Sequence, residues 1–509
     1  MSLSDVDCET SSVVELLSDR ATYAERPRSV ELIETHISWI FLTDRFAYKV
    51  KKPVRFEFLD FSTPELRRDA CREEVRLNRR LASDVYLGTL PITRNDRGIL
   101  ELAGQGEAVD WVVQMRRLPE VKSLECKFRD GSVTAADELA VARHLADFYA
   151  QLPGQSIEAE QYRGAMANHV RANAEACLNW ATFDRQRLRR IRGSQLRYLS
   201  VAEADFAARV AAGHIVDGHG DLRPEHIFLE SPPAVIDCIE FSAELRRVDV
   251  LDDLSFLAME CDRIGRGRVG ERIVAACQAA RGDVTPPTML AFYKSYRALV
   301  RAKVMWLRAA QSVDRRHRAL LRQAHQYVDW AECYANRLGR PALVLVGGLM
   351  GTGKSTLAGQ IAHQIGAEMA ATDEIRRTLF GASQSAAGYD EQIYEPHHRS
   401  RVYDELFSCA AAALDAGLSI VLDGTFLTDE LRRRAVSLAR LHGGVPLYVH
   451  CECPRAAALA RLAARTAAGG SASEGRVDLY DRQAAEQSPA TDDLASVAVD
   501  TTVPPPQQL

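Results

Sequence analysis

The stretch Ala342-Leu-Val-Leu-Val-Gly-Gly-Leu-Met-Gly-Thr-Gly-Lys354-Ser355 decides the fold of the C-terminal half of the chain. Residues 342–346 form an apolar run that is typical of a buried strand, and residues 354–365 have the pattern of a helix. Between them, the glycines let backbone N–H groups face a phosphate, while the N-terminus of the helix adds the positive end of its dipole. The sequence therefore predicts a P-loop that binds ATP, formed by Gly348, Gly351, Thr352, Gly353, Lys354, Ser355 and Thr356.

Acidic residues at two later strand ends support a phosphate-handling site in this half. Asp423 ends the apolar run 420–422, which fits an acid that holds Mg²⁺ together with the hydroxyl of Ser355. Asp373 follows a further expected strand, and its carboxylate is a candidate base for an acceptor hydroxyl. Turn and helix-cap roles are the alternatives for these two aspartates.

Arginines of the C-terminal half are candidates for contacts with anions. Arg461 and Arg465 lie one helical turn apart and either form a lid over the transferring phosphoryl group or lie on a solvated face. Arg376, Arg432 and Arg433 either contact an anionic substrate or lie on a solvated face.

Residues 341–490 resemble the small P-loop kinases grouped with zeta toxins, chloramphenicol phosphotransferase and polynucleotide kinase. The resemblance rests on the P-loop, on TDEIRR (372–377), on LDGTF (422–426) and on RLAAR (461–465). It implies an α/β P-loop domain with a parallel sheet, and transfer of the γ-phosphoryl group of ATP to a hydroxyl. Its members use very different acceptors, so the resemblance does not fix the substrate.

A second motif lies in the N-terminal half, where His219-Gly-Asp221-Leu-Arg-Pro-Glu-His226 is followed by Ile236-Asp237. This pattern resembles the catalytic core of aminoglycoside phosphotransferases and implies an α+β, protein-kinase-like fold. The resemblance implies that Asp221 orients or deprotonates the acceptor hydroxyl and that Asp237 binds Mg²⁺.

The phosphate-binding lysine of such a fold is expected on the strand predicted for residues 46–51. Lys49 fits the Ala-x-Lys rhythm of that strand, but Lys51 shares its face by the two-residue alternation of strands. A helix predicted for residues 64–82 should carry the partner glutamate. Glu74 lies on its apolar stripe and is preferred, and Glu73 remains the alternative.

His226 departs from the resembled pattern, which has asparagine as a second metal ligand at this position. Imidazole nitrogen is a poor match for Mg²⁺, which prefers oxygen ligands. A single firmly held ion, weak turnover or assistance from Glu225 would each be compatible with this change. Asp249 and Asp253 resemble the buried structural acids that follow the metal-binding aspartate in the family.

The order of these motifs indicates several domains. Gly339-Arg-Pro341 interrupts the helical pattern and marks a boundary. We expect an extension over residues 1–29, a kinase-like domain over 30–338 with lobes of 30–118 and 119–338, a P-loop domain over 341–490 and a disordered tail over 491–509. With SWIFLT (38–43), YKVKKP (48–53), LDFSTPELRR (59–68) and IDCIEF (236–241), the whole resembles a bacterial family of fused aminoglycoside phosphotransferase-like and ATP-binding proteins.

Composition limits the partners and the compartment. The formal net charge is −5, which gives no indication of a nucleic-acid or anionic-membrane partner. The 11 dispersed cysteines fit a reducing cytoplasm, and the sequence has no stretch of membrane-spanning length. We therefore expect a cytoplasmic enzyme that uses ATP, Mg²⁺ and a hydroxyl-bearing small molecule; the sequence leaves the oligomeric state undetermined.

Three functions remain open at this point. The first is a bifunctional phosphotransferase in which both halves are active. The second is a P-loop kinase regulated by an N-terminal pseudokinase, an idea motivated by His226. The third is a kinase of polynucleotide 5′-hydroxyl ends, against which the acidic net charge argues weakly.

Overall fold

The computed structural model describes residues 12–56, 59–380, 396–467, 477–489 and 494–503. The chain divides into two compact units. Unit 1 comprises the chain up to Tyr162 together with Ala204–Ala298 and Val304–Leu321, and unit 2 comprises Arg163–Glu203, Leu299–Lys303 and the chain from Arg322 onward. The expected pairing of an α+β kinase-like half with an α/β P-loop half is confirmed.

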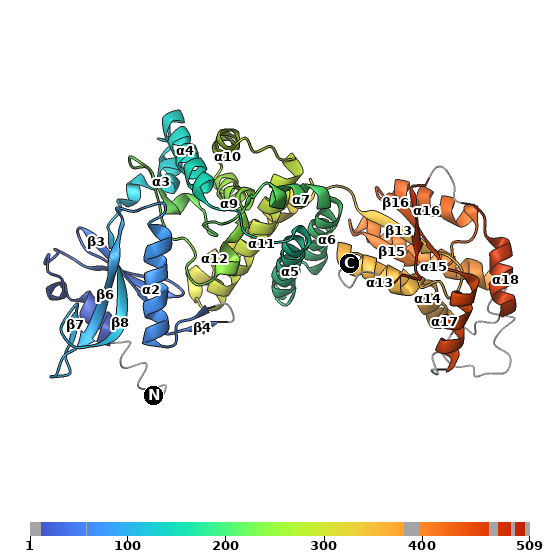
Figure 1. Ribbon diagram of the computed structural model, residues 1–509, viewed down its shortest axis with the longest axis horizontal. Helices are drawn as coiled ribbons and strands as arrows, with labels where there is room; N and C mark the ends of the chain where they lie inside the picture. Colours follow the sequence, from blue (N-terminus) through green and yellow to red (C-terminus); the bar gives the residue numbers. More distant parts are fainter. Residues whose placement is uncertain (1–11, 57–58, 381–395, 468–476, 490–493, 504–509) are drawn as a thin grey trace. The chain divides into compact units, whose positions relative to one another are not determined.

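Unit 1 begins with a six-stranded sheet in the order β1-β2-β3-β8-β6-β7, in which all neighbouring strands are antiparallel. Its strands are β1 (Glu31–Glu34), β2 (Ser38–Leu42), β3 (Phe46–Lys51), β6 (Tyr86–Arg94), β7 (Leu100–Leu102) and β8 (Glu107–Arg116). The short pair β4 (Arg55–Phe56) and β5 (Leu59–Asp60) precedes helix α2 (Pro64–Asn78). Helix α2 lies alongside the sheet (Figure 1).

The two faces of this sheet have different covers. Side chains alternate along β3, so Ala47 packs in the cluster that includes Cys71 and Val75 of α2. Tyr48 and Val50 lie in the opposite cluster. Lys49 and Lys51 therefore share the face that α2 covers.

Residues 12–23, which lie within the extension expected over residues 1–29, cover the other face. A helix spans residues 12–18, and a 3₁₀ turn follows at Arg20–Thr22. Val13, Leu17 and Tyr23 are buried in the same cluster as Tyr48 and Val50. The apolar side chains of this segment complete the core, so it belongs to the sheet lobe.

The remainder of unit 1 is mostly helical. Its helices include α3 (Leu124–Asp130), α4 (Ala135–Gln151), α7 (Glu203–Ala211), α8 (Ala243–Arg246), α9 (Val250–Arg263), α10 (Gly267–Arg281) and most of α11 (Pro287–Ala310). Four short strands also lie in this part of unit 1. They are β9 (Ile215–Asp217), β10 (Ile227–Phe228), β11 (Ala234–Val235) and β12 (Arg247–Asp249), and the turn η3 (Pro224–His226) precedes β10.

Unit 2 contains a five-stranded sheet in which every neighbouring pair is parallel, in the order β14-β15-β13-β16-β17. Its strands are β13 (Ala342–Gly347), β14 (Glu368–Ala371), β15 (Ile420–Asp423), β16 (Val445–Glu452) and β17 (Ser496–Asp500). Helices lie on both faces: α13 (Lys354–Ile365) on one, and α14 (Thr372–Phe380), α15 (Pro396–Asp415) and α16 (Asp429–Leu441) on the other.

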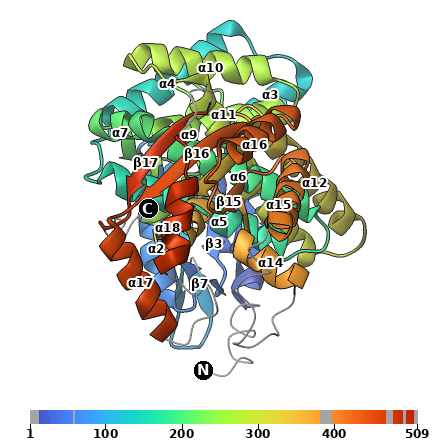
Figure 2. The same cartoon turned by 90° about the vertical axis from the view of Figure 1, so that its right-hand side faces the viewer.

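Strand β17 corrects the expected boundary at residue 490 and the expected disordered tail. Residues 496–500 pair with β16 in parallel, from Tyr448 opposite Ser496 to Glu452 opposite Asp500. Figure 2 shows the two strands side by side. The pairing supplies hydrogen-bond partners for backbone N–H and C=O groups of residues 496–500. The P-loop domain therefore extends past residue 491. Helices α17 (Arg455–Ala467) and α18 (Val477–Glu486) precede it.

Helices that the sequence assigned to the kinase-like domain of residues 30–338 belong in part to unit 2. They are most of α5 (Ala159–Leu178), all of α6 (Arg185–Val201) and most of α12 (Asp314–Ala335). Arg197 of α6 donates from Nη1 to Ser419 Oγ (3.1 Å) and from Nη2 to the carbonyl of Gly339 (2.8 Å). A Cβ at Gly193 would lie 3.1 Å from the Gly366 carbonyl, so α6 approaches the end of α13 closely. Among the described residues, no helix combines the length and the apolarity that crossing a membrane requires.

Candidate active sites

The P-loop joins the central strand of the unit 2 sheet to α13, as the sequence predicted. Gly348 has a φ of 137° and Gly351 a φ of 76°, values that favour glycine. A Cβ at Gly348 would lie 2.5 Å from the Cys451 carbonyl, and one at Gly351 would lie 2.6 Å from the Ala458 carbonyl. These glycines therefore serve both backbone conformation and close packing.

Lys354 and Ser355 begin α13, where the helix dipole favours an anion. The ammonium of Lys354 donates to the carbonyl of Leu349 across the loop (2.8 Å). Asp423, which is 6% exposed, ends β15 beside Val346 of β13. The predicted lysine and acid thus lie at the same edge of the parallel sheet, where ligands of such folds bind.

Asp373 lies in the first turn of α14, directly after β14. Its side chain is 59% exposed and pairs with Arg376 at 2.8 Å. Strand β14 pairs in parallel with β15, and Ala371 lies opposite Asp423. The predicted base therefore follows the strand end that adjoins the predicted metal-binding acid.

The predicted arginines have different surroundings. Arg461 donates to the hydroxyl (3.2 Å) and carbonyl (2.6 Å) of Thr501, whose hydroxyl donates to the Thr352 carbonyl of the P-loop (2.7 Å). The side chain of Arg465 lies outside the described residues. Arg433 is exposed and pairs with Asp429.

Arg432 is neither a substrate contact nor a solvated residue. It is 1% exposed and donates from Nη1 to the carbonyls of Phe426 (2.8 Å) and Leu427 (3.2 Å). Its Nη2 donates to the carbonyls of Ser488 (3.1 Å) and Pro489. The guanidinium supplies hydrogen bonds to loop carbonyls that helices and strands leave unpaired, so Arg432 is structural.

In unit 1, Lys49 joins two elements of the predicted site. Its Nζ lies 2.8 Å from Glu74 Oε1 and 2.8 Å from Asp237 Oδ1. Glu73, the alternative glutamate, pairs with Arg76 instead. The lysine, the helix glutamate and the predicted metal-binding aspartate are thus brought together.

Lys51 extends the same network away from Asp237. Its Nζ lies 2.5 Å from Glu74 Oε2 and also contacts Glu240. Burial lowers the pKa of Lys51, but the carboxylates of Glu240 and Glu74 raise it above its ordinary value. Burial of Glu240 raises the pKa of its carboxyl. Of the two lysines that share the face, Lys49 is the one that contacts Asp237.

Asp237 lies in the loop after β11, not on a strand, and its φ is 64°. Such a conformation costs roughly 1–3 kcal/mol and persists where the surroundings hold it. Burial acts to raise the pKa of Asp237, but the ammonium of Lys49, which also donates to Asp237 Oδ1, holds that pKa below its ordinary value. The side chain is 43% exposed, so solvent moderates both effects.

The loop that carries Asp221 is anchored by buried charged side chains. Asp253 accepts from the backbone N–H groups of His219 (2.7 Å) and Gly220 (2.9 Å). Arg297 donates to the Gly220 carbonyl (3.0 Å) and forms two 2.7 Å hydrogen bonds with Asp252. These contacts fix the backbone immediately before Asp221. Asp249, the other resembled structural acid, pairs with Arg209.

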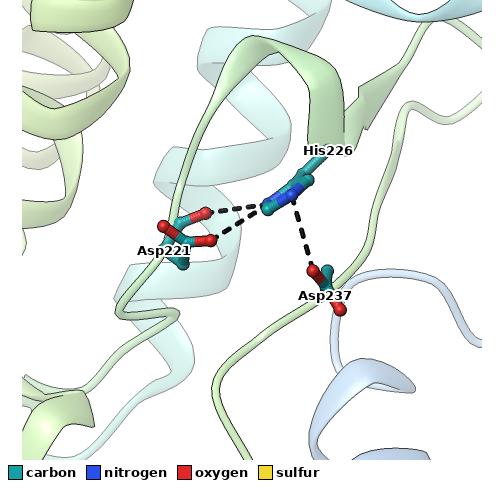
Figure 3. Close-up of side chains that lie close together, drawn as sticks. All are labelled: Asp221, His226 and Asp237. Atoms are coloured by element: carbon teal, nitrogen blue, oxygen red, sulfur yellow. Dashed lines mark hydrogen bonds and ion pairs between the residues drawn. The ribbon is translucent and has the colours of Figure 1, made fainter. Parts of the chain in front are cut away.

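Arg223 is a site residue that the sequence reasoning missed. Its guanidinium lies 2.9 Å from Asp221 Oδ2, 2.5 Å from Glu225 Oε1 and 3.0 Å from His226 Nε2. Asp221, His226 and Asp237 point toward one another, and each offers a ligand atom within 4.8 Å of the others (Figure 3). A cation two residues after Asp221 was the available signal for Arg223.

The two sites differ in how well their donors suit Mg²⁺. The hydroxyl of Ser355 and the carboxylate of Asp423 are oxygen donors of the kind that Mg²⁺ accepts. Asp221 and Asp237 also offer oxygen, but His226 offers nitrogen. The donor set of the P-loop site fits Mg²⁺, and the His226 position of the other site does not.

Thr501 and Gln483 are further contacts of the P-loop that sequence reasoning missed. Gln483 Oε1 accepts from the Met350 N–H (3.1 Å), and Thr501 binds the Thr352 carbonyl. The signal for the segment before Thr501 was the alternation of valines in Ser-Val-Ala-Val-Asp (496–500), which is a strand pattern.

Comparison with solved structures gives only distant likenesses. A choline/ethanolamine kinase family protein from Mesorhizobium loti is 12% identical and covers 64% of this chain and 99% of its own, with a TM-score of 0.34. An aminoglycoside-3′-phosphotransferase of type VIII is 14% identical over 57% of this chain and 98% of its own, with a TM-score of 0.32. A gluconokinase from Sinorhizobium meliloti is 20% identical over 33% of this chain and 86% of its own, with a TM-score of 0.23. Likenesses at these TM-scores do not determine the activity of this chain.

Sequence comparison gives closer relatives. Residues 343–489 match the family described as AAA domain (AAA_33). The chain is 34% identical over 420 residues to protein Rv2004c of Mycobacterium tuberculosis and to protein Mb2027c of Mycobacterium bovis. Each match covers 81% of this chain and 81% of the relative, and therefore includes parts of both units. The chain belongs to the family of these mycobacterial proteins.

Proposed function

We propose that the protein is a bifunctional, ATP- and Mg²⁺-dependent phosphotransferase. Each site transfers the γ-phosphoryl group of ATP to a hydroxyl of a small-molecule acceptor. The observation that carries this proposal is that both units combine a lysine with a nearby aspartate at a phosphate-type site. Lys49 lies 2.8 Å from Asp237, and Lys354 begins the helix next to the strand that ends in Asp423.

In the kinase-like site, Lys49 binds phosphate oxygens of ATP and Glu74 holds its ammonium in place. Asp221 accepts the proton of the acceptor hydroxyl and orients its oxygen. Asp237 is the metal-binding acid. Because Asp253 and Arg297 fix the backbone before Asp221, this carboxylate is held at a defined position.

In the P-loop site, backbone N–H groups of Gly348–Thr356 and the ammonium of Lys354 bind the phosphates. Ser355 and Asp423 hold Mg²⁺, which, when bound, neutralises charge on the phosphoryl oxygens. Asp373 is the base for the acceptor. Arg461 and Arg465 form the lid, and the link from Arg461 through Thr501 to the P-loop supports this role for the first of them.

A second candidate function is that unit 1 regulates the P-loop kinase without catalysing transfer. The observation that favours it is the ion pair between Arg223 and Asp221, because Arg223 engages the carboxylate that would have to accept the proton of the acceptor hydroxyl. The nitrogen donor of His226 points the same way.

The two functions are separated by single and double substitutions in the full-length chain. We would measure γ-phosphoryl transfer from labelled ATP to a panel of hydroxyl compounds, including an oligonucleotide with a free 5′-hydroxyl. Wild type, Lys354→Ala, Asp237→Asn and the double variant would be compared. The bifunctional proposal expects each single variant to lose one set of products and the double variant to lose all. Loss of every product in Lys354→Ala alone would contradict it and support regulation.

The full-length chain is needed because the units are not continuous in sequence. Arg163–Glu203 belongs to unit 2, where α6 packs against α13 and Arg197 binds Ser419. A chain cut near residue 335 would separate these helices from the P-loop sheet. Activities of isolated halves would then report misfolding as well as catalysis.

A further inference from the structure

Two contacts fix which nitrogen of His226 carries a proton. Nδ1 lies 2.9 Å from the Asp221 carbonyl oxygen, which can only accept, so Nδ1 bears the hydrogen. Nε2 lies 3.0 Å from Nη2 of Arg223, which can only donate, so Nε2 bears a lone pair. The two contacts independently indicate the same neutral tautomer. His226 therefore presents a nitrogen lone pair at Nε2.

This lone pair lies beside the Asp237 carboxylate, and the Asp221 carboxylate approaches the other nitrogen of the same ring. Nε2 is 3.5 Å from Asp237 Oδ2, and the Asp221 carboxylate is 3.8 Å from the imidazole at Nδ1. Figure 3 shows the imidazole between the two aspartates. The Nδ1–H bond to a carbonyl is the type of contact that orients metal-binding imidazoles and raises their basicity. The histidine is thus prepared to act as a ligand through Nε2.

The chemistry of this donor set distinguishes among divalent cations. Mg²⁺ strongly prefers oxygen ligands, whereas first-row transition cations accept imidazole nitrogen together with carboxylate oxygen. We propose that Asp221, His226 and Asp237 bind a first-row transition divalent cation in preference to Mg²⁺, with Nε2 of His226 as a ligand. The inference rests on the proposed function only in taking this site to be the metal site of unit 1.

Arg223 competes with the cation for the same lone pair. Its Nη2 donates to Nε2, but the guanidinium also pairs with Asp221 and Glu225. A cation on Nε2 displaces the hydrogen bond to His226 and competes for the Asp221 carboxylate, while the contact with Glu225 keeps Arg223 nearby as a positive charge. Removing that charge should therefore strengthen cation binding.

The test uses full-length protein with Asp423→Asn as the common background, so that the predicted acid of the P-loop site is absent. Mn²⁺ is the probe, its binding followed by electron paramagnetic resonance, with Mg²⁺ as competitor. His226→Asn is the matched variant, because its amide can still donate to the Asp221 carbonyl while its oxygen replaces the nitrogen ligand. We expect the preference for Mn²⁺ over Mg²⁺ to fall about tenfold or more in this variant, which corresponds to about 1.4 kcal/mol.

Two further measurements identify the ligand atom directly. Electron spin echo modulation should show ¹⁴N coupling to bound Mn²⁺ in the background protein and none in His226→Asn. Arg223→Gln should bind Mn²⁺ more tightly than the background protein. Absence of ¹⁴N coupling, or an Mn²⁺ preference unchanged by His226→Asn, would overturn the inference.

Failure of this inference is distinguishable from failure of the proposed function. Phosphoryl transfer by Lys354→Ala with Mg²⁺ alone, together with no ¹⁴N coupling, would leave the function standing and refute the nitrogen ligand. Nitrogen-coupled Mn²⁺ without transfer by unit 1 under any divalent cation would support the metal site and refute catalysis there.

Discussion

The lysines of the two sites are held by different partners. Lys49 lies between the carboxylates of Glu74 and Asp237, whereas Lys354 donates to the backbone carbonyl of Leu349. A carboxylate carries a full charge and a carbonyl only a partial one, so each of these contacts of Lys49 is electrostatically stronger than this contact of Lys354. The kinase-like site is organised by buried ion pairs, and the P-loop site is organised by its backbone. Loss of a charged side chain should therefore lower the folding stability at the kinase-like site, whereas at the P-loop site it should lower chiefly the activity.

Replacing Lys51 gives the largest expected difference between the two modes of organisation. Lys51 is fully buried between Glu74 and Glu240, so Lys51→Met leaves Glu240 without this charge partner. We expect a loss of about 4 kcal/mol in the free energy of unfolding. Lys49→Met should lose about half of that, because Lys51 still neutralises Glu74 and Asp237 is partly exposed. Urea denaturation measures both, and equal losses would contradict the division of roles between the lysines.

Replacing Lys354 should change activity with little change in folding. In an Asp237→Asn background, Lys354→Ala should lower kcat/KM for transfer by about 10²–10³-fold, or about 3–4 kcal/mol, because a charge stabilising the transition state is lost. The urea midpoint should stay close to that of the background protein, because Lys354 is only partly buried at the start of α13. Lys354→Arg tests whether charge alone suffices. A loss below tenfold in Lys354→Ala would refute the assignment.

Arg432 and Arg433, which are adjacent in α16, test how far the stability of the P-loop unit depends on a buried charged side chain. Arg432→Ala removes donors to the carbonyls of Phe426, Leu427 and Ser488, and should destabilise the protein by about 2–3 kcal/mol. Arg433→Ala is the matched control, because its exposed side chain pairs only with Asp429 among the contacts described, and should change stability by less than about 0.5 kcal/mol. Thermal and urea unfolding of both variants, side by side, would detect the difference. Equal losses of stability in Arg432→Ala and Arg433→Ala would show that the buried contacts of Arg432 do not stabilise the fold.

Lowering the pH should reduce the free energy of unfolding through protonation of His219, which lies in the kinase-like site. Burial lowers the pKa of His219 to about 4, so the folded state binds its proton less readily than the unfolded state, whose pKa is about 6.5. The stabilisation is complete above pH 6.5 and is lost as the pH falls toward 4. Between pH 7 and pH 5 the loss should be about 2 kcal/mol.

The matched variant for this effect is His219→Asn, which lacks the titrating group. Urea denaturation at both pH values should show the wild type losing about 2 kcal/mol more than the variant between pH 7 and pH 5. Parallel losses in the two proteins would assign the acid sensitivity to other groups. The effect is the smallest of the four because a single buried group titrates.

Local motifs predicted the parts of both sites that depend on backbone chemistry. The glycines and Lys354 define strand, loop and helix in one continuous segment, so the P-loop was predictable from its own residues. Strand β3 was predicted with its observed bounds, and Glu74 was preferred to Glu73 because a helical stripe determines which side faces the sheet.

Features that depend on distant segments were predicted poorly. Strand β17 pairs with β16 after two intervening helices, so its short polar-edged sequence resembled a tail. Arg432 lies in a segment whose composition is typical of a surface helix. Its burial depends instead on carbonyls near residue 488. Likewise, the helical pattern of α6 does not indicate that this helix packs against α13 of unit 2. In each case the deciding partner is remote in sequence.

The contact between Thr501 and the P-loop has a consequence for biosynthesis. The hydroxyl of Thr501 donates to the Thr352 carbonyl across 149 residues of sequence. At roughly 5–20 residues per second, the ribosome adds these residues in roughly 7–30 s, during which the loop lacks this brace. Strand β17, which pairs with β16, is synthesised in the same interval. The nucleotide loop of the nascent chain therefore acquires this brace only after β17 has been translated.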